Sequence, residues 1–237
     1  MVVAFVAGAT GYTGQAVVKA LCDAGHAVTA HVRPDSKRLQ HFEQAFGAQG
    51  ATVSACKWKA EDISKALRTI NPDLVFSLLG TTRARTKADK KEGFESTYET
   101  VDYGLTKLLI DALVRNSQTP RFVYLSSMGA GGEPSGAYMA ARAKSEKALI
   151  ESGIPYTIAR PSFITGSDRD EARTGERIGA GTVDALLAVV GLFGAKQLQA
   201  RYRSTTATTL AESLVRHSLD SASENQVLLS DQLKASD

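Results

Sequence analysis

One run of residues near the start of this chain constrains its fold more than any other feature. Residues 2–7 are apolar, and Gly8, Gly11 and Gly14 follow them at a spacing of three. Residues 15–21 then place apolar side chains at helical intervals. A strand that turns sharply into a helix leaves the first backbone N–H groups of that helix directed at one point, where the positive end of the helix dipole favours a phosphate. The run therefore predicts a strand, a turn and a helix that bind the pyrophosphate of a dinucleotide.

Each glycine in this turn has its own physical role. Gly8 permits the tight turn, Gly11 lets the backbone approach a pyrophosphate, and Gly14 lets the helix pack closely on the strand. A second apolar run at 27–32, just past Gly25, completes a βαβ unit of about thirty residues. A glycine turn without a ligand is the alternative. The residues expected to contact the cofactor here are Gly8, Thr10, Gly11, Tyr12, Thr13 and Gly14.

The composition is that of an ordinary globular protein. The 237 residues are 43% hydrophobic and 22% charged, which suits a single domain, 1–237, with a sizeable core. The net charge of +3 is too small to indicate a nucleic-acid partner. Cys22 and Cys56 are the only cysteines and the four histidines are scattered, so neither a metal site nor a disulfide framework is expected.

The chain carries no pattern typical of secretion or of a membrane span. Its apolar start lacks a basic leading segment and runs straight into the glycine turn, which is unlike a signal peptide. A later apolar stretch, 183–193, contains Asp184 and is shorter than the roughly 18 residues that a spanning helix needs. Together with two cysteines expected to be reduced, these features predict a cytoplasmic protein without a membrane partner.

Apolar runs alternate with helical patterns along most of the chain. The expected strands are 2–7, 27–32, 52–56, 74–79, 122–126 and 156–159. The expected helices are 13–24, 36–47, 61–70, 96–116 and 138–152. This alternation, with short connections, predicts an α/β fold: a doubly wound parallel sheet of the Rossmann type, covered by helices on both faces.

The pattern changes after Pro161. Residues 162–182 are rich in Gly, Asp, Arg and Thr and are expected to form a loop. The elements expected after it are a helix at 183–193, a strand near 198–203, a helix at 207–219 and a strand at 226–229. We interpret 162–205 as a small C-terminal substrate cap within the single domain, and the final strand as the last edge of the sheet.

The end of the second expected strand indicates which dinucleotide binds. Sites that prefer NAD usually place a carboxylate there, on the ribose 2′-hydroxyl. This strand ends in Arg33, with no acidic residue before Asp35. A carboxylate would repel a 2′-phosphate, whereas the planar fork of Arg33 suits one. The sequence therefore predicts NADP(H) in preference to NAD(H), unless Arg33 merely opens a surface loop.

A second group of polar residues follows the fifth expected strand. Ser126 and Ser127 come at its end. Tyr138, Arg142 and Glu146 follow at a spacing of four, which places them on one side of a helix. A fixed cation beside a tyrosine stabilises tyrosinate and lowers the phenol pKa from about 10. With a serine hydroxyl to hold a carbonyl, these parts suit hydride transfer between a nicotinamide and a small-molecule carbonyl or alcohol, with the tyrosine as acid.

These motifs together resemble the short-chain dehydrogenases/reductases, and within them the atypical branch of NmrA-like and Tat-interacting oxidoreductase-like proteins. The resemblance covers most of residues 1–165. It is carried by Gly8-Ala9-Thr10-Gly11-Tyr12-Thr13-Gly14, Leu79-Gly80-Thr81-Thr82-Arg83, Val101-Asp102-Tyr103, Leu125-Ser126-Ser127 and Arg160-Pro161-Ser162-Phe163-Ile164-Thr165-Gly166. These motifs are specific for the superfamily and say little about the substrate.

The resemblance implies roles for individual residues. Tyr138 would be the general acid/base and Ser127 its partner, with Ser126 as the alternative if the alignment shifts by one. The further cofactor contacts that it implies are Leu79, Gly80, Thr81, Ser126, Arg160 and Pro161.

Two positions depart from the family pattern. The family's Tyr-x-x-x-Lys motif has Arg142 in the lysine position, where the lysine lowers the tyrosine pKa and bonds the nicotinamide ribose. Arg142 keeps the charge but differs in bulk and geometry, and Lys144 is expected to point away from Tyr138. Lys57 and Trp58 stand where an acidic residue usually lies near the adenine, and Trp58 either stacks on the adenine or packs at the surface.

Three functions are weighed. The first is an NADP(H)-dependent oxidoreductase with Tyr138, Ser127 and Arg142 as catalytic residues. The alternative is a redox sensor that binds NADP and signals through a protein partner, which Arg142 and the basic loop 83–91 favour. An epimerase or dehydratase is less favoured, because such relatives carry a longer C-terminal domain. Family members often dimerise through the helices expected at 96–116 and 138–152, so a homodimer is also an expectation.

Overall fold

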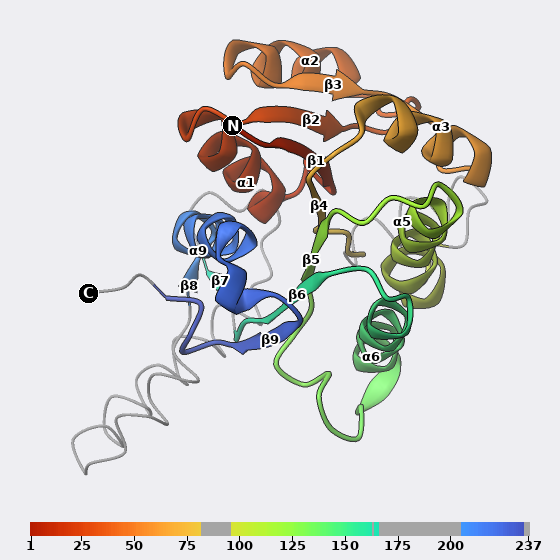
Figure 1. The fold of residues 1–237 in the computed structure, drawn as a ribbon, viewed down its shortest axis with the longest axis vertical. Coiled ribbons are helices and arrows are strands. Elements are labelled where there is room, and N and C mark those ends of the chain that lie inside the picture. The colour runs from red at the N-terminus through yellow and green to blue at the C-terminus, as the bar shows by residue number, and fades with distance from the viewer. Residues whose placement is uncertain (82–95, 163, 166–204, 235–237) are drawn as a thin grey trace.

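The protein is built around a parallel β-sheet. The computed structural model describes residues 1–81, 96–162, 164–165 and 205–234. Within these residues, seven parallel strands form one sheet in the order β3-β2-β1-β4-β5-β6-β9 (Figure 1). The strands are β1 (Val3–Ala7), β2 (Ala27–His31), β3 (Thr52–Ser54), β4 (Leu74–Ser77), β5 (Arg121–Leu125), β6 (Tyr156–Arg160) and β9 (Gln226–Leu229). The predicted doubly wound sheet is thus confirmed, including the last strand at its edge.

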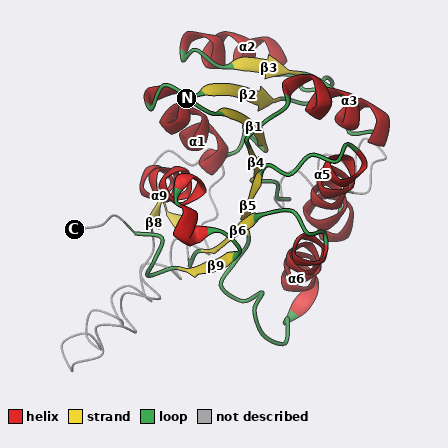
Figure 2. Ribbon diagram, viewed as in Figure 1, coloured by secondary structure: helices red, strands yellow, loops and turns green. Residues whose placement is uncertain are grey.

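Helices cover the sheet on both faces (Figure 2). One face carries α1 (Tyr12–Asp23), α2 (Leu39–Ala48) and α9 (Ala207–Leu219); the other carries α3 (Ala60–Ile70), α5 (Gly104–Arg115) and α6 (Gly136–Glu151). Successive side chains of β1 point to opposite faces of the sheet, so Val6 packs with the first set of helices and Phe5 with the second. The apolar core therefore lies on both sides of the sheet, as the near-continuous apolar strands require.

The order of the strands fixes where a ligand can bind. From β1 the chain moves outward through β2 and β3 in one direction, and from β4 outward through β5, β6 and β9 in the other. The connections that leave β1 and β4 therefore run in opposite directions from the carboxyl edge of the sheet, which is where open α/β sheets bind their ligands. The glycine turn and the segment after β4 lie on either side of this switch point.

The helix predicted at 96–116 differs from expectation at its start. A π-helix, η1 (Tyr98–Tyr103), begins after Thr97, whose side chain accepts a hydrogen bond from the Thr100 amide, and α5 follows. The wider π-turn carries Asp102 fully buried. A continuous α-helical pattern does not reveal this widening, because it depends on what Asp102 binds in the folded chain.

The described part of the C-terminal region is confined to the ends of the predicted cap. Strand β7 (Ile164–Thr165) pairs in parallel with β8 (Thr205–Thr206), which brings the two ends of that segment together. The predicted helix at 183–193, the predicted strand at 198–203 and the basic loop 83–95 lie outside the described residues. Of the helices that the structure describes, none combines the length and apolar character that crossing a bilayer requires.

Candidate functional site

The glycine turn after β1 is packed against the chain that leaves β4. Gly8 has a φ of +80°, and a Cβ atom there would lie 2.6 Å from the carbonyl oxygen of Leu78. A Cβ at Gly14 would collide with the carbonyl oxygen of Gly8. Gly11 closes the turn, since its amide donates to the Gly8 oxygen at 3.0 Å. The roles predicted for Gly8 and Gly14 thus have direct geometric causes in this fold.

The amino end of α1 is open to an anion. Its N-cap is Gly11, in an extended conformation, and no side chain caps it. The first turn contains no acidic residue. Backbone N–H groups at such an end need an acceptor, and the helix dipole favours a negative one. This geometry suits the phosphate site that the sequence predicts, and the cofactor contacts of Thr10, Tyr12 and Thr13 stay a prediction.

The segment after β4 is fixed by a buried carboxylate that sequence reasoning had not placed in the site. Thr81 donates to Asp102 Oδ2 twice, from its amide at 2.9 Å and from its hydroxyl at 2.5 Å. Asp102 comes from η1, and its second carboxylate oxygen lies 2.9 Å from Arg142 Nη2. The predicted cofactor segment Leu79-Gly80-Thr81 is therefore held in place by a charged pair underneath it. A Cβ at Gly80 would lie 2.9 Å from the same Arg142 nitrogen, so the segment lies directly on the guanidinium.

Arg142 is a buried cation with several partners. It is 5% exposed and donates from Nη1 to the carbonyl oxygen of Leu125 at 2.9 Å and to the Tyr124 hydroxyl at 3.3 Å. Burial lowers the pKa of Arg142, but Tyr124, Tyr138 and Asp102 raise it more, so that the net shift is upward. The guanidinium therefore stays charged, and it ties α6 to β5 and to η1.

Tyr138 lies in the first turns of α6, beside that cation. The Arg142 guanidinium carbon is 5.1 Å from the centroid of the Tyr138 ring, and the ring of Tyr98 meets it edge-on at 5.3 Å. Among the described residues, no group hydrogen-bonds to the Tyr138 hydroxyl. Lys144, by contrast, is exposed and pairs with Glu99 at 2.7 Å, as expected for a residue that points away from Tyr138.

The two serines after β5 differ in accessibility. Ser126 is buried, and its hydroxyl donates to Glu146 Oε1 at 2.5 Å. Ser127 is only partly buried, and no described residue hydrogen-bonds to its hydroxyl. Of the two candidates that the sequence left open, Ser127 is therefore the one whose hydroxyl is available to a ligand.

Glu146 joins Ser126 to Arg160. Arg160 donates from Nε to Glu146 Oε1 at 3.0 Å and from Nη2 to Oε2 at 2.5 Å. These hydrogen bonds to Glu146 are the main cause of the raised pKa of Arg160. The neighbouring Pro161 accepts a hydrogen bond from the Met128 amide at 3.1 Å, so the chains leaving β5 and β6 run side by side. The sequence pattern placed Glu146 on the Tyr138 side of the helix but did not identify these partners.

Arg33, which follows β2, is more exposed than the buried Arg142. The Arg33 side chain is 37% exposed, and it pairs with Asp35 at 3.5 Å. Trp58 packs on the buried His31, with ring centroids 4.6 Å apart. Burial lowers the pKa of His31, whose Nε2 lies 2.9 Å from the carbonyl oxygen of Cys56. Arg33 is thus loosely held where a 2′-phosphate is expected, while Trp58 has a packing partner within the protein.

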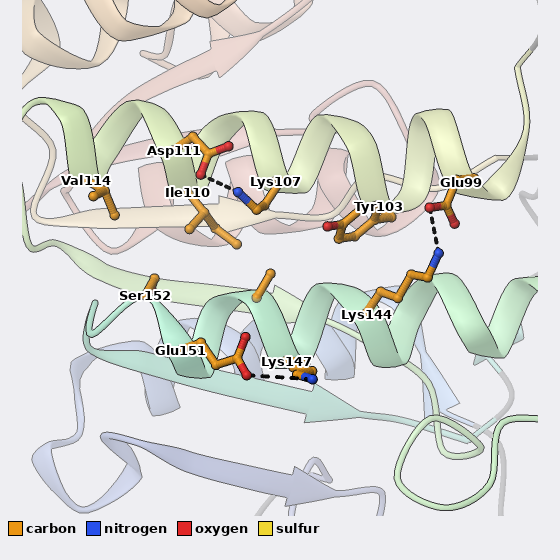
Figure 3. Close-up of a pocket in the computed structure, with 11 residues that line it drawn as sticks. Glu99, Tyr103, Lys107, Ile110, Asp111, Val114, Lys144, Lys147, Glu151 and Ser152 are labelled. Atoms are coloured by element: carbon orange, nitrogen blue, oxygen red, sulfur yellow. Dashed lines mark hydrogen bonds and ion pairs between the residues drawn. The ribbon is translucent and has the colours of Figure 1, made fainter.

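A separate groove lies between α5 and α6, away from these residues (Figure 3). Its volume is about 620 Å³. Lys107 and Asp111 pair along the α5 side and Lys147 and Glu151 along the α6 side, while Lys144 pairs with Glu99 between the two sides (Figure 3). It contains no residue predicted for the cofactor or for catalysis. The homodimer expected through these two helices stays a prediction.

Comparison with known proteins agrees with this geometry. A model of the NAD(P)H-binding family matches residues 8–185. The chain is 34% identical over 179 residues to Protein TIC 62, chloroplastic, of Pisum sativum, an alignment that covers 66% of this chain and 32% of the pea protein. The chain therefore spans about a third of that relative's length. Because this relative is named chloroplastic, the cytoplasmic location expected from the cysteines stays a prediction.

Solved structures show the same fold. A putative NAD-dependent epimerase/dehydratase from Bacillus halodurans matches with a TM-score of 0.68 at 18% identity, over 96% of this chain and 92% of that one. The leucoanthocyanidin reductase–NADPH complex from Vitis vinifera matches with a TM-score of 0.60 at 16% identity, over 94% and 65%. The family match, the glycine turn and the strand order agree, and the chain belongs to the NAD(P)H-binding family.

Proposed function

We propose that this protein is an NADP(H)-dependent oxidoreductase that transfers hydride to or from a small carbonyl or alcohol. The observation that carries the proposal is the surroundings of Tyr138. Its hydroxyl has no partner among the described residues, while the buried cation Arg142 lies 5.1 Å from its ring. A phenol whose hydroxyl has no protein partner can hydrogen-bond to a substrate oxygen and transfer its proton to it.

The reaction would proceed with distinct roles for the residues at this edge of the sheet. The nicotinamide, when bound, supplies the hydride that reaches the carbonyl carbon. Ser127 donates a hydrogen bond to the carbonyl oxygen and orients it. Tyr138 transfers its proton to that oxygen as the alcohol forms, and regains a proton from water afterwards. Arg142 is placed to act on Tyr138 through its charge near the ring, since Nη2 pairs with Asp102 and Nη1 donates to Leu125 and Tyr124.

Arg33 is proposed to select NADP(H) over NAD(H). Replacing Arg33 with alanine should raise the Kd for NADPH by about tenfold or more, because a charge-assisted contact to the 2′-phosphate is lost. The Kd for NADH should change by less than about twofold, since NADH lacks that phosphate. Calorimetric titration of both nucleotides into each variant measures the two effects.

The matched control for this prediction is Arg115→Ala, at the exposed far end of α5. It removes the same charge far from the glycine turn, so both affinities should stay at the wild-type values. If both substitutions weaken NADPH binding equally, the effect of Arg33 comes from the net charge of the protein and not from a contact with the 2′-phosphate. Tighter binding of NADH than of NADPH by the wild type would overturn the assignment.

A second candidate is a redox sensor that binds NADP without turnover. One observation favours it: Arg142 takes the family's lysine position, and its contacts to Asp102 and Leu125 are those of a structural residue. Tight NADPH binding without NADPH oxidation across a broad panel of carbonyls would favour the sensor. Carbonyl-dependent oxidation would favour the oxidoreductase.

A further inference from the structure

An ion pair between the buried Glu146 and the partly buried Arg160 lies beside the segment that carries Ser127. Glu146, on α6, is 4% exposed, and its carboxylate accepts two hydrogen bonds from Arg160 at the end of β6. The same carboxylate accepts the Ser126 hydroxyl at 2.5 Å. Glu146 therefore joins the carboxyl ends of two neighbouring strands to one helix, and none of these three contacts requires a ligand.

The guanidinium of Arg160 also packs closely against the backbone of Gly131, four residues after Ser127. A Cβ atom on Gly131 would collide with Arg160 Nη1 and would lie 2.6 Å from Cζ. Arg160 cannot easily give way, because its other two nitrogens are bound to Glu146. A Cβ on Gly129 would likewise lie 2.9 Å from the sulfur of Met139 on α6.

Segment 126–131 is thus fixed at both ends. At its start the Ser126 amide donates to Ala159 at 2.8 Å, and the Met128 amide donates to Pro161 at 3.1 Å. At its end Gly131 lies on the Arg160 guanidinium. Ser127 lies between these anchors, so the place of its hydroxyl depends on the ion pair beside it.

We propose that Glu146 and Arg160 are positioning residues, whose ion pair sets the place of segment 126–131 and hence of the Ser127 hydroxyl relative to Tyr138. The inference rests on the proposed function for the roles of Ser127 and Tyr138. The geometry does not depend on that function: Glu146 holds the Arg160 guanidinium, and this guanidinium packs against Gly131. Gly131 is accordingly the residue whose size the arrangement restricts.

The test compares Gly131→Ala with Gly132→Ala. A Cβ on Gly132 would meet no atom within 4 Å, so this neighbouring substitution is the matched control. Gly131→Ala should lower kcat for carbonyl reduction by about 10- to 100-fold, the effect of displacing a reacting group by about 1 Å. The Kd for NADPH should change by less than about twofold, because the glycine turn is untouched. Amide hydrogen exchange in 126–131 should become faster in this variant alone.

Arg160→Lys provides the coupling measurement. Lysine retains a charge for Glu146 but lacks the fork that lies on Gly131. Gly131→Ala should therefore lower kcat by about 10- to 100-fold in the wild-type background and by less than about threefold in the Arg160→Lys background. Glu146→Gln keeps the side-chain volume but removes the charge, so it should speed amide hydrogen exchange in 126–131 and lower kcat. This variant takes the place of Gly131→Ala if Gly131→Ala does not fold.

The outcomes separate this inference from the proposed function. If the wild type reduces no carbonyl, the oxidoreductase fails, while hydrogen exchange still tests whether the ion pair orders the segment. If the wild type is active but Gly131→Ala and Gly132→Ala match in kcat and exchange, the positioning role is overturned. Faster exchange in Gly131→Ala with unchanged kcat overturns it as well, because the ion pair would then order a segment that catalysis does not use.

Discussion

Replacing Tyr138 with phenylalanine should reduce turnover by about 100- to 10,000-fold, the usual contribution of a general acid. Phenylalanine keeps the ring that packs against Tyr98 and faces Arg142, and removes only the hydroxyl. The affinity for NADPH should therefore stay within about twofold, because the glycine turn and Arg33 are unchanged. Steady-state oxidation of NADPH with a reducible carbonyl gives the first quantity, and calorimetric titration gives the second.

Tyr156→Phe is the matched control for this experiment. Tyr156 begins β6, at the opposite end of the strand from Arg160, and loses the same hydroxyl when it is replaced. Its turnover should equal that of the wild type. Undiminished turnover in Tyr138→Phe would remove Tyr138 from the mechanism. Loss of turnover together with loss of NADPH binding would show that the hydroxyl is needed to bind the cofactor, and would not support its role as a proton donor.

Replacing Asp102 with alanine should lower the free energy of unfolding by about 3–5 kcal/mol, the usual effect of leaving a buried charge without its partner. Asp102 is fully buried and is the carboxylate that faces Arg142. It also accepts two hydrogen bonds from Thr81, so the alanine leaves the backbone amide and the hydroxyl of that residue without their acceptor. Urea unfolding followed by circular dichroism measures the change.

The control for Asp102 is an ion pair of the same kind at the surface. Asp111 pairs with Lys107 at 2.5 Å, but its side chain is 51% exposed. Asp111→Ala should therefore change the free energy of unfolding by no more than about 0.5 kcal/mol, since solvent screens such pairs. Equal effects of the two substitutions would mean that burial of the Asp102–Arg142 pair contributes nothing.

The cofactor end of the site was largely readable from the sequence. Its signals are local: an apolar run, glycines at fixed spacing and a helical pattern lie within one short stretch of chain. The structure shows why Gly8 and Gly14 have no side chain, since a Cβ at either would meet backbone. The Arg33 prediction was also local, and the structure leaves that side chain partly exposed after β2.

The interactions of the predicted catalytic residues could be predicted only in part from the sequence. The pattern placed Tyr138, Arg142 and Glu146 on one side of a helix and left Ser126 and Ser127 as alternatives. The partner of Arg142 could not be read, because Asp102 lies in another helical segment and is buried only once η1, α5 and α6 pack. The partner of Ser126 lies 20 residues further along the chain, so no local pattern identifies it.

The sequence by itself determined the parallel layered fold, the order of its elements and the glycine turn, because periodic burial and turn chemistry act between residues that are close along the chain. Only the tertiary structure decided what the charged side chains of α6 do. Arg142 and Glu146 find their opposite charges on η1 and β6, and a buried charge is tolerated only where such a partner is brought to it. Packing therefore fixed which charged residues pair beside the predicted site, and it left the Ser127 and Tyr138 hydroxyls without a hydrogen-bond partner among the described residues.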